Sequence, residues 1–156
     1  MNPTLSNRPA ARVLVIDDDA GIHAAIRQVL GHWPFRGGSP RHLPTASGPA
    51  ITALQFEVTS TYHGEGGLAA VRESVQTARP FAVAFVDVRM PGWDGVETTC
   101  RLWEADPDLQ VVLCSAFSDY CWEDIVSRLG ISDRLVILKK PFEAIEVRQL
   151  SHVLAE

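Results

Sequence analysis

Acidic side chains follow two strongly apolar segments of the 156-residue chain. Asp17, Asp18 and Asp19 come directly after the run VLVI, and Asp87 ends the run FAVAFVD. Two carboxylates about 5 Å apart repel each other by roughly 3 kcal/mol at an effective dielectric constant near 20, so a cluster of carboxylates requires a cation. Carboxylate oxygens without a nearby His or Cys suit a hard ion, and Mg²⁺ fits best, with Mn²⁺ as the alternative.

Two more polar residues stand at the ends of apolar runs. Ser115 follows VVLC, and Lys140 follows VILK. In an open parallel sheet, ligands bind outside the carboxyl ends of the strands. Taken alone, the acidic turn at Asp17 and Asp18 would also be explained as a helix cap. Because Asp87, Ser115 and Lys140 likewise stand at the ends of apolar runs, we interpret the whole set as one cation-binding site.

The elements that must position these residues alternate along the chain. Short runs rich in Val, Ile and Phe predict strands over residues 12–16, 55–60, 81–86, 109–114 and 134–138. Between them, five sets of apolar residues recur with helical spacing: Ile22, Ile26, Val29 and Leu30; Leu68, Val71 and Val75; Val96, Cys100 and Trp103; Trp122, Ile125, Val126 and Leu129; and Val147, Leu150, Val153 and Leu154. This alternation predicts an α/β fold, and strands that are apolar on both faces predict a parallel sheet between two helical layers.

We expect the chain to form one domain with one long insertion. The length suits a single core, and 46% hydrophobic with 21% charged residues is typical of a globular protein. A flexible N-terminus is predicted over residues 1–11 and a single domain over residues 12–155. Within that domain, a Gly/Pro-rich insertion is predicted at about residues 31–52, between the first helix and the second strand.

The composition argues against several classes of protein. A net charge of −5 disfavours direct nucleic-acid binding. No apolar run approaches the roughly 20 residues that span a bilayer, and the N-terminal segment lacks the apolar middle of a signal peptide. The three cysteines form no CxxC pair, and their odd number argues against a disulfide framework. We therefore expect a cytoplasmic protein that contacts neither nucleic acid nor membrane.

The chain resembles the receiver domains of response regulators in two-component signalling. The matching residues are the acidic pair Asp17–Asp18, the segment DVRMPGWDG at residues 87–95, which echoes the family's D-x-x-MP-x-x-DG, Ser115–Ala116, and KPF at residues 140–142. The resemblance covers about residues 12–154. It implies a flavodoxin-like, doubly wound, five-stranded parallel sheet with strand order 2-1-3-4-5, and a role in bacterial phosphorelay signal transduction.

The resemblance makes Asp87 the phosphoacceptor. This carboxylate would take a phosphoryl group from the phosphohistidine of a sensor histidine kinase or a phosphotransfer protein. Asp18, Asp87 and the backbone carbonyl of Arg89 would bind Mg²⁺ directly, with Asp17 acting partly through water. The domain would not be an enzyme in the ordinary sense, because it would catalyse only its own phosphotransfer and dephosphorylation.

The resemblance also assigns ligands of the phosphoryl group. Lys140 would pair with one phosphoryl oxygen, Ser115 would donate a hydrogen bond to another, and the backbone N–H of Ala116 is a further donor. The Lys140–Pro141 peptide bond is expected to be cis. The arriving phosphoryl group adds a charge of about −1.5 to −2, which would pull Ser115 inward and alter a binding surface. The expected partner is a downstream effector protein or a fused output domain, with a homodimer as a further alternative.

The sequence departs from the family at the positions that tune and transmit the signal. Ile137 stands where receivers usually carry an aromatic residue or His, so the usual switch cannot operate unchanged. Phe117 or Tyr120, which follow Ser115 closely in the sequence, would take over the role of the missing aromatic residue. Arg89, Ala116 and Phe117 occupy positions that tune the lifetime of the phosphoryl group. We hypothesise that bulky Phe117 and cationic Arg89 restrict the attacking water and make the phosphoryl group long-lived.

A dinucleotide-binding domain is one rival interpretation. Gly64, Gly66 and Ala69 match G-x-G-x-x-A after a predicted strand, and Asp87 follows about 20 residues later, as such a site requires. Glu65 counts against this interpretation, because it would place a carboxylate beside the pyrophosphate.

A phosphatase and a receiver-like binding module are two further rival interpretations. A phosphatase with an aspartyl nucleophile would need a second acid two residues later, and that residue is Arg89. A receiver-like module that binds proteins without being phosphorylated is the main rival, since Ile137 departs from the family pattern.

Overall fold

The computed structural model describes residues 10–31, 55–116, 122–130 and 132–155. Five strands alternate with five helices within these ranges, as predicted: β1 (Ala11–Ile16), α1 (Ala20–Gly31), β2 (Phe56–Thr61), α2 (Gly64–Gln76), β3 (Val83–Asp87), α3 (Gly95–Ala105), β4 (Gln110–Ser115), α4 (Trp122–Leu129), β5 (Leu135–Lys139) and α5 (Ala144–Leu154). Strands β2 to β5 each end one residue later than predicted. Asp87 and Ser115 are therefore the last residues of their strands.

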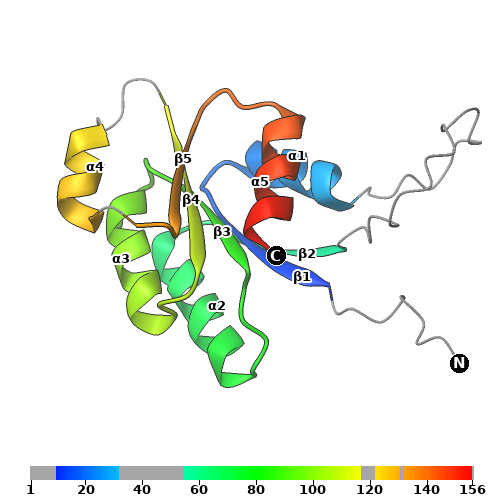
Figure 1. Cartoon of the computed structure of the whole chain (residues 1–156), viewed down its shortest axis with the longest axis horizontal. Coiled ribbons are helices and arrows are strands. Elements are labelled where there is room, and N and C mark those ends of the chain that lie inside the picture. Colours follow the sequence, from blue (N-terminus) through cyan, green and yellow to red (C-terminus); the bar gives the residue numbers. More distant parts are fainter. Residues whose placement is uncertain (1–9, 32–54, 117–121, 131, 156) are drawn as a thin grey trace, which may run out of the picture.

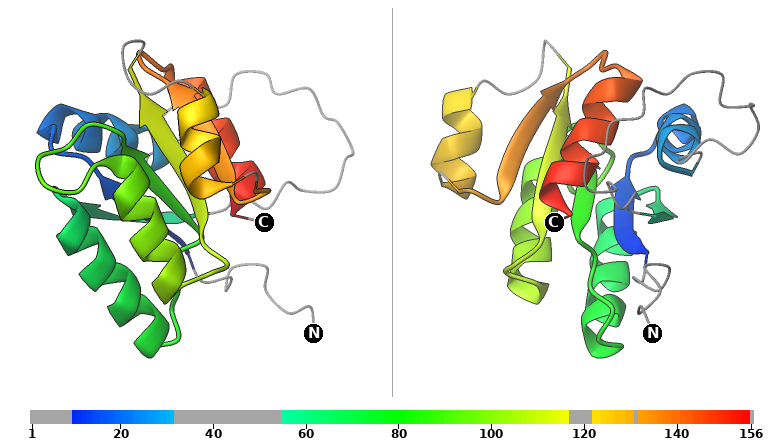
Figure 2. Two further views of the ribbon diagram at one scale, coloured as in Figure 1. Left: turned by 90° about the vertical axis from the view of Figure 1, so that its left-hand side faces the viewer. Right: turned by 45° about the vertical axis from the view of Figure 1, so that its right-hand side comes forward.

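The strands form one parallel sheet in the order β2-β1-β3-β4-β5. This order confirms the predicted flavodoxin-like topology. Helices α1 and α5 lie on one side of the sheet, and α2, α3 and α4 lie on the other (Figures 1 and 2). The chain thus forms three layers, and the carboxyl ends of all five strands point to the same edge.

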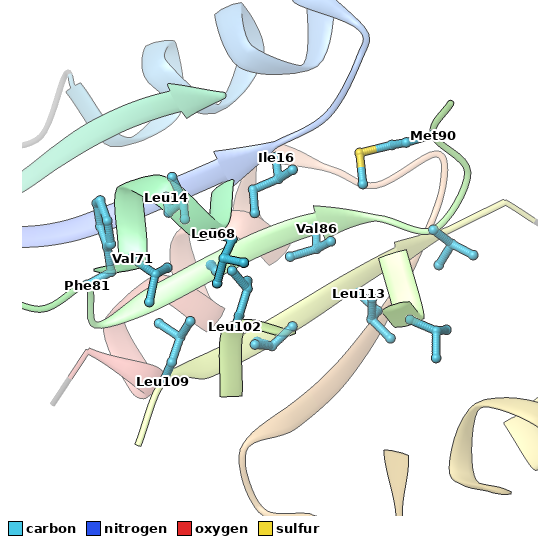
Figure 3. Packing of buried hydrophobic residues seen from close by; sticks show 14 of the residues in the cluster. Leu14, Ile16, Leu68, Val71, Phe81, Val86, Met90, Leu102, Leu109 and Leu113 are labelled. Atoms are coloured by element: carbon cyan, nitrogen blue, oxygen red, sulfur yellow. The ribbon is translucent and has the colours of Figure 1, made fainter. Parts of the chain in front are cut away.

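Alternate residues of each strand face opposite helical layers, as a period of two requires. Leu14 and Ile16 of β1 pack toward α2 and α3, whereas Val13 and Val15 pack toward α1 and α5. Figure 3 shows the first of these clusters, in which Val86 of the central strand lies among side chains from several elements. The two clusters hold β3 rigidly from both faces, so its last residue has a fixed position.

Among the predicted core residues whose side chains the structure describes, two are exposed. Val75 has 45% of its surface exposed and Val153 has 64%, although both fit the helical spacing of their neighbours. Ser74 is buried beside Val75, with its hydroxyl donating to the carbonyl of Val71 at 2.7 Å, and Ser151 is buried near Val153. At each helix end the structure buries a small residue on the sheet side and turns the larger Val outward.

The predicted irregular segments fall largely outside the described residues. Of the predicted N-terminal segment 1–11, Ala11 is in β1 and pairs with Phe56 of β2. Of the predicted insertion 31–52, Gly31 is the last residue of α1. Within the described ranges, no helix is long and apolar enough to cross a membrane.

Candidate functional site

The strand register brings the predicted site residues to one edge of the sheet. β1 and β3 are neighbours, with Ile16 opposite Val86, so the residues that follow them lie side by side. β4 lies beside β3, and β5 beside β4. The backbone N–H of Lys140 donates to the carbonyl of Ser115 at 2.8 Å, which fixes Lys140 just beyond the end of β5.

Three carboxylates converge at this edge, as predicted. Asp17, Asp18 and Asp87 each offer one oxygen atom, and these atoms lie within 4.8 Å of one another. Asp17 and Asp87 are buried, with 2% and 7% of their surfaces exposed, whereas Asp18 is exposed to solvent. The cluster is therefore open on the side of Asp18, where a ligand can enter.

Lys140 bridges two of the three carboxylates. Its Nζ donates to Oδ1 of Asp87 at 3.0 Å and to Oδ2 of Asp17 at 3.3 Å. One ammonium offsets only one of the three negative charges. The remaining charge of −2 is what a divalent cation would neutralise.

The pKa values of Asp87 and Lys140 reflect this crowding. Burial raises the pKa of Asp87 above its ordinary value, the hydrogen bond from Lys140 opposes the rise, and the negative charge of Asp17 adds to it. Burial lowers the pKa of Lys140, but its hydrogen bonds to the two carboxylates and their charges outweigh burial, so the pKa is raised overall. Lys140 thus stays protonated, and keeping Asp87 ionised beside it costs free energy because the carboxylate is buried.

Asp17 is held at all of its polar groups. Its N–H donates to the carbonyl of Thr61 at 3.2 Å, and its carbonyl lies 2.7 Å from Nε2 of His23. Its Oδ1 accepts the N–H of Asp19 at 2.9 Å, and its Oδ2 accepts Nζ of Lys140. With both carboxylate oxygens engaged, Asp17 suits an indirect role toward a cation.

Ser115 has its hydroxyl inside the site but turned to its own backbone. The residue is buried, and Oγ donates to the carbonyl of Ala116 at 3.1 Å. A hydroxyl rotates at little cost, so Ser115 can redirect its donor toward an anion at Asp87. Ala116, the residue after β4, is exposed.

The chain turns sharply after Asp87. Gly92 has φ +80°, which favours glycine, and the N–H of Gly95 donates to the carbonyl of Val88 at 2.8 Å. A Cβ at Gly95 would collide with the carbonyl oxygen of Asp87. Asp94 caps α3 by accepting the N–H of Glu97 at 2.8 Å. The motif DVRMPGWDG therefore closes a tight turn that packs the start of α3 against the predicted acceptor.

The structure describes only some of the predicted tuning and switch positions. Arg89 is exposed beside the site. Ile137 is partly buried and pairs with Leu113 of β4. It packs against the core cluster that lies between the sheet and helices α2, α3 and α4. Phe117 and Tyr120 lie outside the described residues. The predicted cis bond between Lys140 and Pro141 is confirmed.

Packing explains the glycines that suggested a dinucleotide site. A Cβ at Gly64 would collide with Oγ1 of Thr98 on α3, and one at Gly66 would come within 3.0 Å of Cε1 of His63. Gly64 lets α2 approach α3 closely, and Gly66 leaves room for the His63 ring that caps α2. These glycines therefore require no nucleotide.

The residues present fit Mg²⁺. All three convergent side chains are carboxylates, which are the oxygen ligands that a hard cation prefers, and the cluster contains no His or Cys that would favour zinc. Within the described residues, no hydrogen bond engages Oδ2 of Asp87, so this oxygen is available to a ligand.

His23 and Thr61, which hold the backbone of Asp17, were not predicted from the sequence. His23 shares a buried face of α1 with Ile26 and Leu30. A polar residue three and seven positions before these two buried apolar residues was a signal that could have identified it.

Comparisons with known proteins match most of the chain to one family. The family model of the response regulator receiver domain matches residues 42–151. That range contains Asp87, Ser115 and Lys140, whereas the acidic pair Asp17–Asp18 precedes it.

A curated relative supports the same family, and a solved structure shares the fold. The chain is 33% identical to the chemotaxis protein CheY of Listeria monocytogenes over 89 residues, which are 57% of this chain and 69% of that protein. It is 23% identical to sporulation initiation phosphotransferase F of Bacillus subtilis over 137 residues, 88% of this chain and 87% of that one. Its fold matches the REC domain of AraT, a response regulator from Geobacillus stearothermophilus, with a TM-score of 0.65, 19% identity and 94% of each chain covered.

Proposed function

Because the chain belongs to the response regulator receiver domain family of two-component signalling, we propose that Asp87 accepts a phosphoryl group and that its phosphorylation switches a protein–protein interaction. The observation that carries this proposal is the position of Asp87. It ends the central strand β3, holds a hydrogen bond from Lys140, and lies within 4.8 Å of two other carboxylates at the open edge of the sheet.

In the proposed reaction, an oxygen of the Asp87 carboxylate attacks the phosphorus atom of a donor phosphohistidine. The new O–P bond forms as the P–N bond breaks, and the donor imidazole leaves. Asp87 must be ionised for this attack. Burial raises the pKa of Asp87 in the cation-free protein, so at low pH this carboxyl has to lose a proton before it can bind the cation and react.

Lys140 and Ser115 receive the product. Nζ of Lys140 already donates to Asp87 and Asp17, so a small movement lets it pair with a phosphoryl oxygen. Rotation of the Ser115 hydroxyl away from Ala116 supplies a second donor. Both groups are held by strand ends, so little reorganisation accompanies the transfer.

Asp18, Asp87 and the backbone carbonyl of Arg89 would hold Mg²⁺, or Mn²⁺ in its place, and Asp17 would assist through water. When bound, the cation offsets the negative charge that accumulates during phosphoryl transfer. The convergent carboxylates and the charge left unbalanced by Lys140 support this assignment.

The lifetime of the phosphoryl group is proposed to depend on Arg89, Ala116 and Phe117. Arg89 is exposed beside the acceptor, where its charge and bulk can restrict an attacking water. In Phe117→Ala, hydrolysis of the phosphoryl group should accelerate. Rapid hydrolysis in the wild type that is unchanged in this variant would exclude a protective role for Phe117.

The partners are proposed to be a sensor histidine kinase or phosphotransfer protein upstream, and an effector protein or fused output domain downstream, in the cytoplasm. The module signals rather than catalysing a reaction of a separate substrate. Ile137 has no ring to swing inward, so the inward movement of Ser115 must reach the surface through aliphatic packing between β4, β5 and α4.

Mass spectrometry after treatment with acetyl phosphate and Mg²⁺ tests the proposal. The expected result is one phosphoryl adduct that is lost in Asp87→Asn and on chelation with EDTA. A wild type that stays unmodified with both acetyl phosphate and phosphorylated histidine donors would instead favour a binding module that works without phosphorylation.

A further inference from the structure

His23 is a buried polar residue that the proposed reaction does not use. It lies in the first turns of α1, and 3% of its surface is exposed. Its Nε2 lies 2.7 Å from the carbonyl oxygen of Asp17, a distance typical of a strong hydrogen bond. A buried imidazole therefore holds the backbone of the acidic turn from behind.

The surroundings of His23 place its proton on Nε2. A carbonyl oxygen can only accept, so Nε2 must donate in this pair. Nδ1 is buried, and no hydrogen-bond partner of it lies within the described residues. The ring of Tyr62, which is exposed to solvent, lies against the buried imidazole, with centroids 4.5 Å apart and an interplanar angle of 45°.

The carbonyl that His23 holds belongs to the peptide group between Asp17 and Asp18. Rotation of this peptide would move the carboxylate of Asp18 relative to that of Asp87. Among the described residues, no hydrogen bond like those from Lys140 to Asp17 and Asp87 holds the exposed carboxylate of Asp18 in place. The N–H of Asp17 is already fixed by Thr61, so His23 removes the freedom that remains at its carbonyl.

We infer that His23 is a positioning residue for divalent-cation binding: its Nε2–H fixes the Asp17–Asp18 peptide so that the carboxylate of Asp18 stays next to that of Asp87. The inference rests on the proposed function, since it assumes that these carboxylates bind a cation. It concerns the affinity for the cation and leaves the chemistry at Asp87 unchanged.

The variants His23→Gln and His23→Met separate this role from packing. The two replacements have nearly the same shape and both lose the ring contact with Tyr62, but only Gln retains an N–H donor near the position of Nε2. We expect the dissociation constant for Mg²⁺ to rise about tenfold in His23→Met, at the lower end of the loss that removing a supporting hydrogen bond causes at a metal site. In His23→Gln it should stay within about threefold of the wild type, since the donor is restored.

Two titrations of the full chain test the inference. Calorimetry with MgCl₂ gives the dissociation constant, and phosphorylation by acetyl phosphate at increasing MgCl₂ gives the half-saturating concentration and the maximal rate. In His23→Met the half-saturating concentration should rise while the rate at saturating Mg²⁺ stays within about twofold of the wild type, as expected for a lost positioning contact. Equal affinity for Mg²⁺ in the Gln and Met variants would overturn the inference while leaving the proposed function intact.

If His23→Met does not fold, a measurement on the wild-type protein tests the role of His23 instead. Nitrogen-15 NMR of the imidazole should find the proton on Nε2, with this N–H in a hydrogen bond, and the resonance should move when MgCl₂ is added. A proton on Nδ1 would overturn the inference. A wild type that binds no Mg²⁺ would overturn the proposed function, and the inference with it.

Discussion

Asp87 is almost fully buried, with 7% of its surface exposed, although the proposed reaction requires its charged form. Lys140 provides one compensating charge, but burial and the nearby charge of Asp17 still raise the pKa of Asp87. A residue placed for chemistry in this way destabilises the folded state. The net cost of the Asp87 charge to the stability of the folded protein can be measured by removing that charge.

We predict that Asp87→Asn increases the free energy of unfolding by about 1–2 kcal/mol at neutral pH without divalent cations, because it relieves repulsion among three carboxylates. Since the pKa of Asp87 is raised in the folded protein, the charge destabilises the wild type fully above that pKa. The advantage of the variant should shrink as the pH falls through the raised pKa, and it should vanish below the ordinary value of 3.8, where the wild-type carboxyl is neutral in both states.

Urea unfolding at several pH values measures this difference. Asp133→Asn is a matched control, because Asp133 is exposed and lies in the turn before β5; its effect should stay within about 0.5 kcal/mol. Equal effects of the two substitutions, or a gain for Asp87→Asn that persists at the lowest pH, would contradict the electrostatic explanation.

Cys114 illustrates how β4 shields its residues from solvent. Only 2% of its surface is exposed, and burial raises the pKa of its thiol to about 12. We predict that iodoacetamide does not modify Cys114 in the native protein at pH 8, because neither access nor thiolate is available. Cys100 on α3 is partly exposed, and burial raises its pKa as well, so it should react slowly but measurably.

Peptide mapping by mass spectrometry, with and without denaturant, distinguishes the two thiols. Cys114 should be labelled only after unfolding. Native labelling of Cys114 at the rate of Cys100 would show that β4 opens without global unfolding.

At the scale of elements, the turn between β3 and α3 connects the acceptor to a helix. Gly95 begins α3 directly against the backbone of Asp87. We predict that Gly95→Ala lowers the free energy of unfolding by about 1–3 kcal/mol, because backbone atoms cannot move aside as a flexible side chain would. The forced shift of Asp87 should also reduce the rate of phosphorylation at saturating Mg²⁺ by at least about tenfold.

Gly31→Ala is the matched control for this substitution. Gly31 ends α1, and a Cβ there would meet nothing within 4 Å. Alanine should leave the free energy of unfolding unchanged or raise it by up to about 1 kcal/mol through its helix propensity. If Gly95→Ala proved as benign as Gly31→Ala, in stability and in phosphorylation rate, the close packing of α3 on Asp87 could not be important for either.

The elements and their order along the chain were predictable because strands β1, β3, β4 and β5 are apolar on both faces and each helix on one. The same property predicted the site, since parallel strands bring Asp17, Asp87, Ser115 and Lys140 to one edge. Strand ends were misplaced by one residue because polar residues such as Asp87 and Ser115 still pair with neighbouring strands although they end the apolar run.

Tertiary contacts decided the features that could not be predicted. The helical period allows either Ser74 or Val75 to face inward, and only packing against the sheet selects Ser74. The hydrogen bond of His23 joins residues six positions apart through a turn, a geometry that no local pattern encodes. The roles of Arg89, Phe117 and Ile137 stay predictions, since they concern ligands and movements.

At the scale of the whole molecule, the site joins four strands of the sheet. Asp17 follows β1, Asp87 ends β3, Ser115 ends β4 and Lys140 follows β5. A ligand held jointly by these ends would bind only the folded protein, because the unfolded chain cannot assemble them. Cation binding should therefore stabilise the entire domain.

We predict that Mg²⁺ raises the melting temperature of the wild type. At a free concentration one hundred times the dissociation constant, the free energy of unfolding should increase by about 2.7 kcal/mol, which corresponds to a shift of about 5–10 °C for a domain of this size. Calorimetric melts in MgCl₂, against KCl of equal ionic strength, measure it. Asp87→Asn should melt higher than the wild type in KCl but respond much less to Mg²⁺, since it lacks a central ligand. A Mg²⁺ response that is the same in both proteins would place the cation elsewhere and remove the acidic cluster from the proposed mechanism.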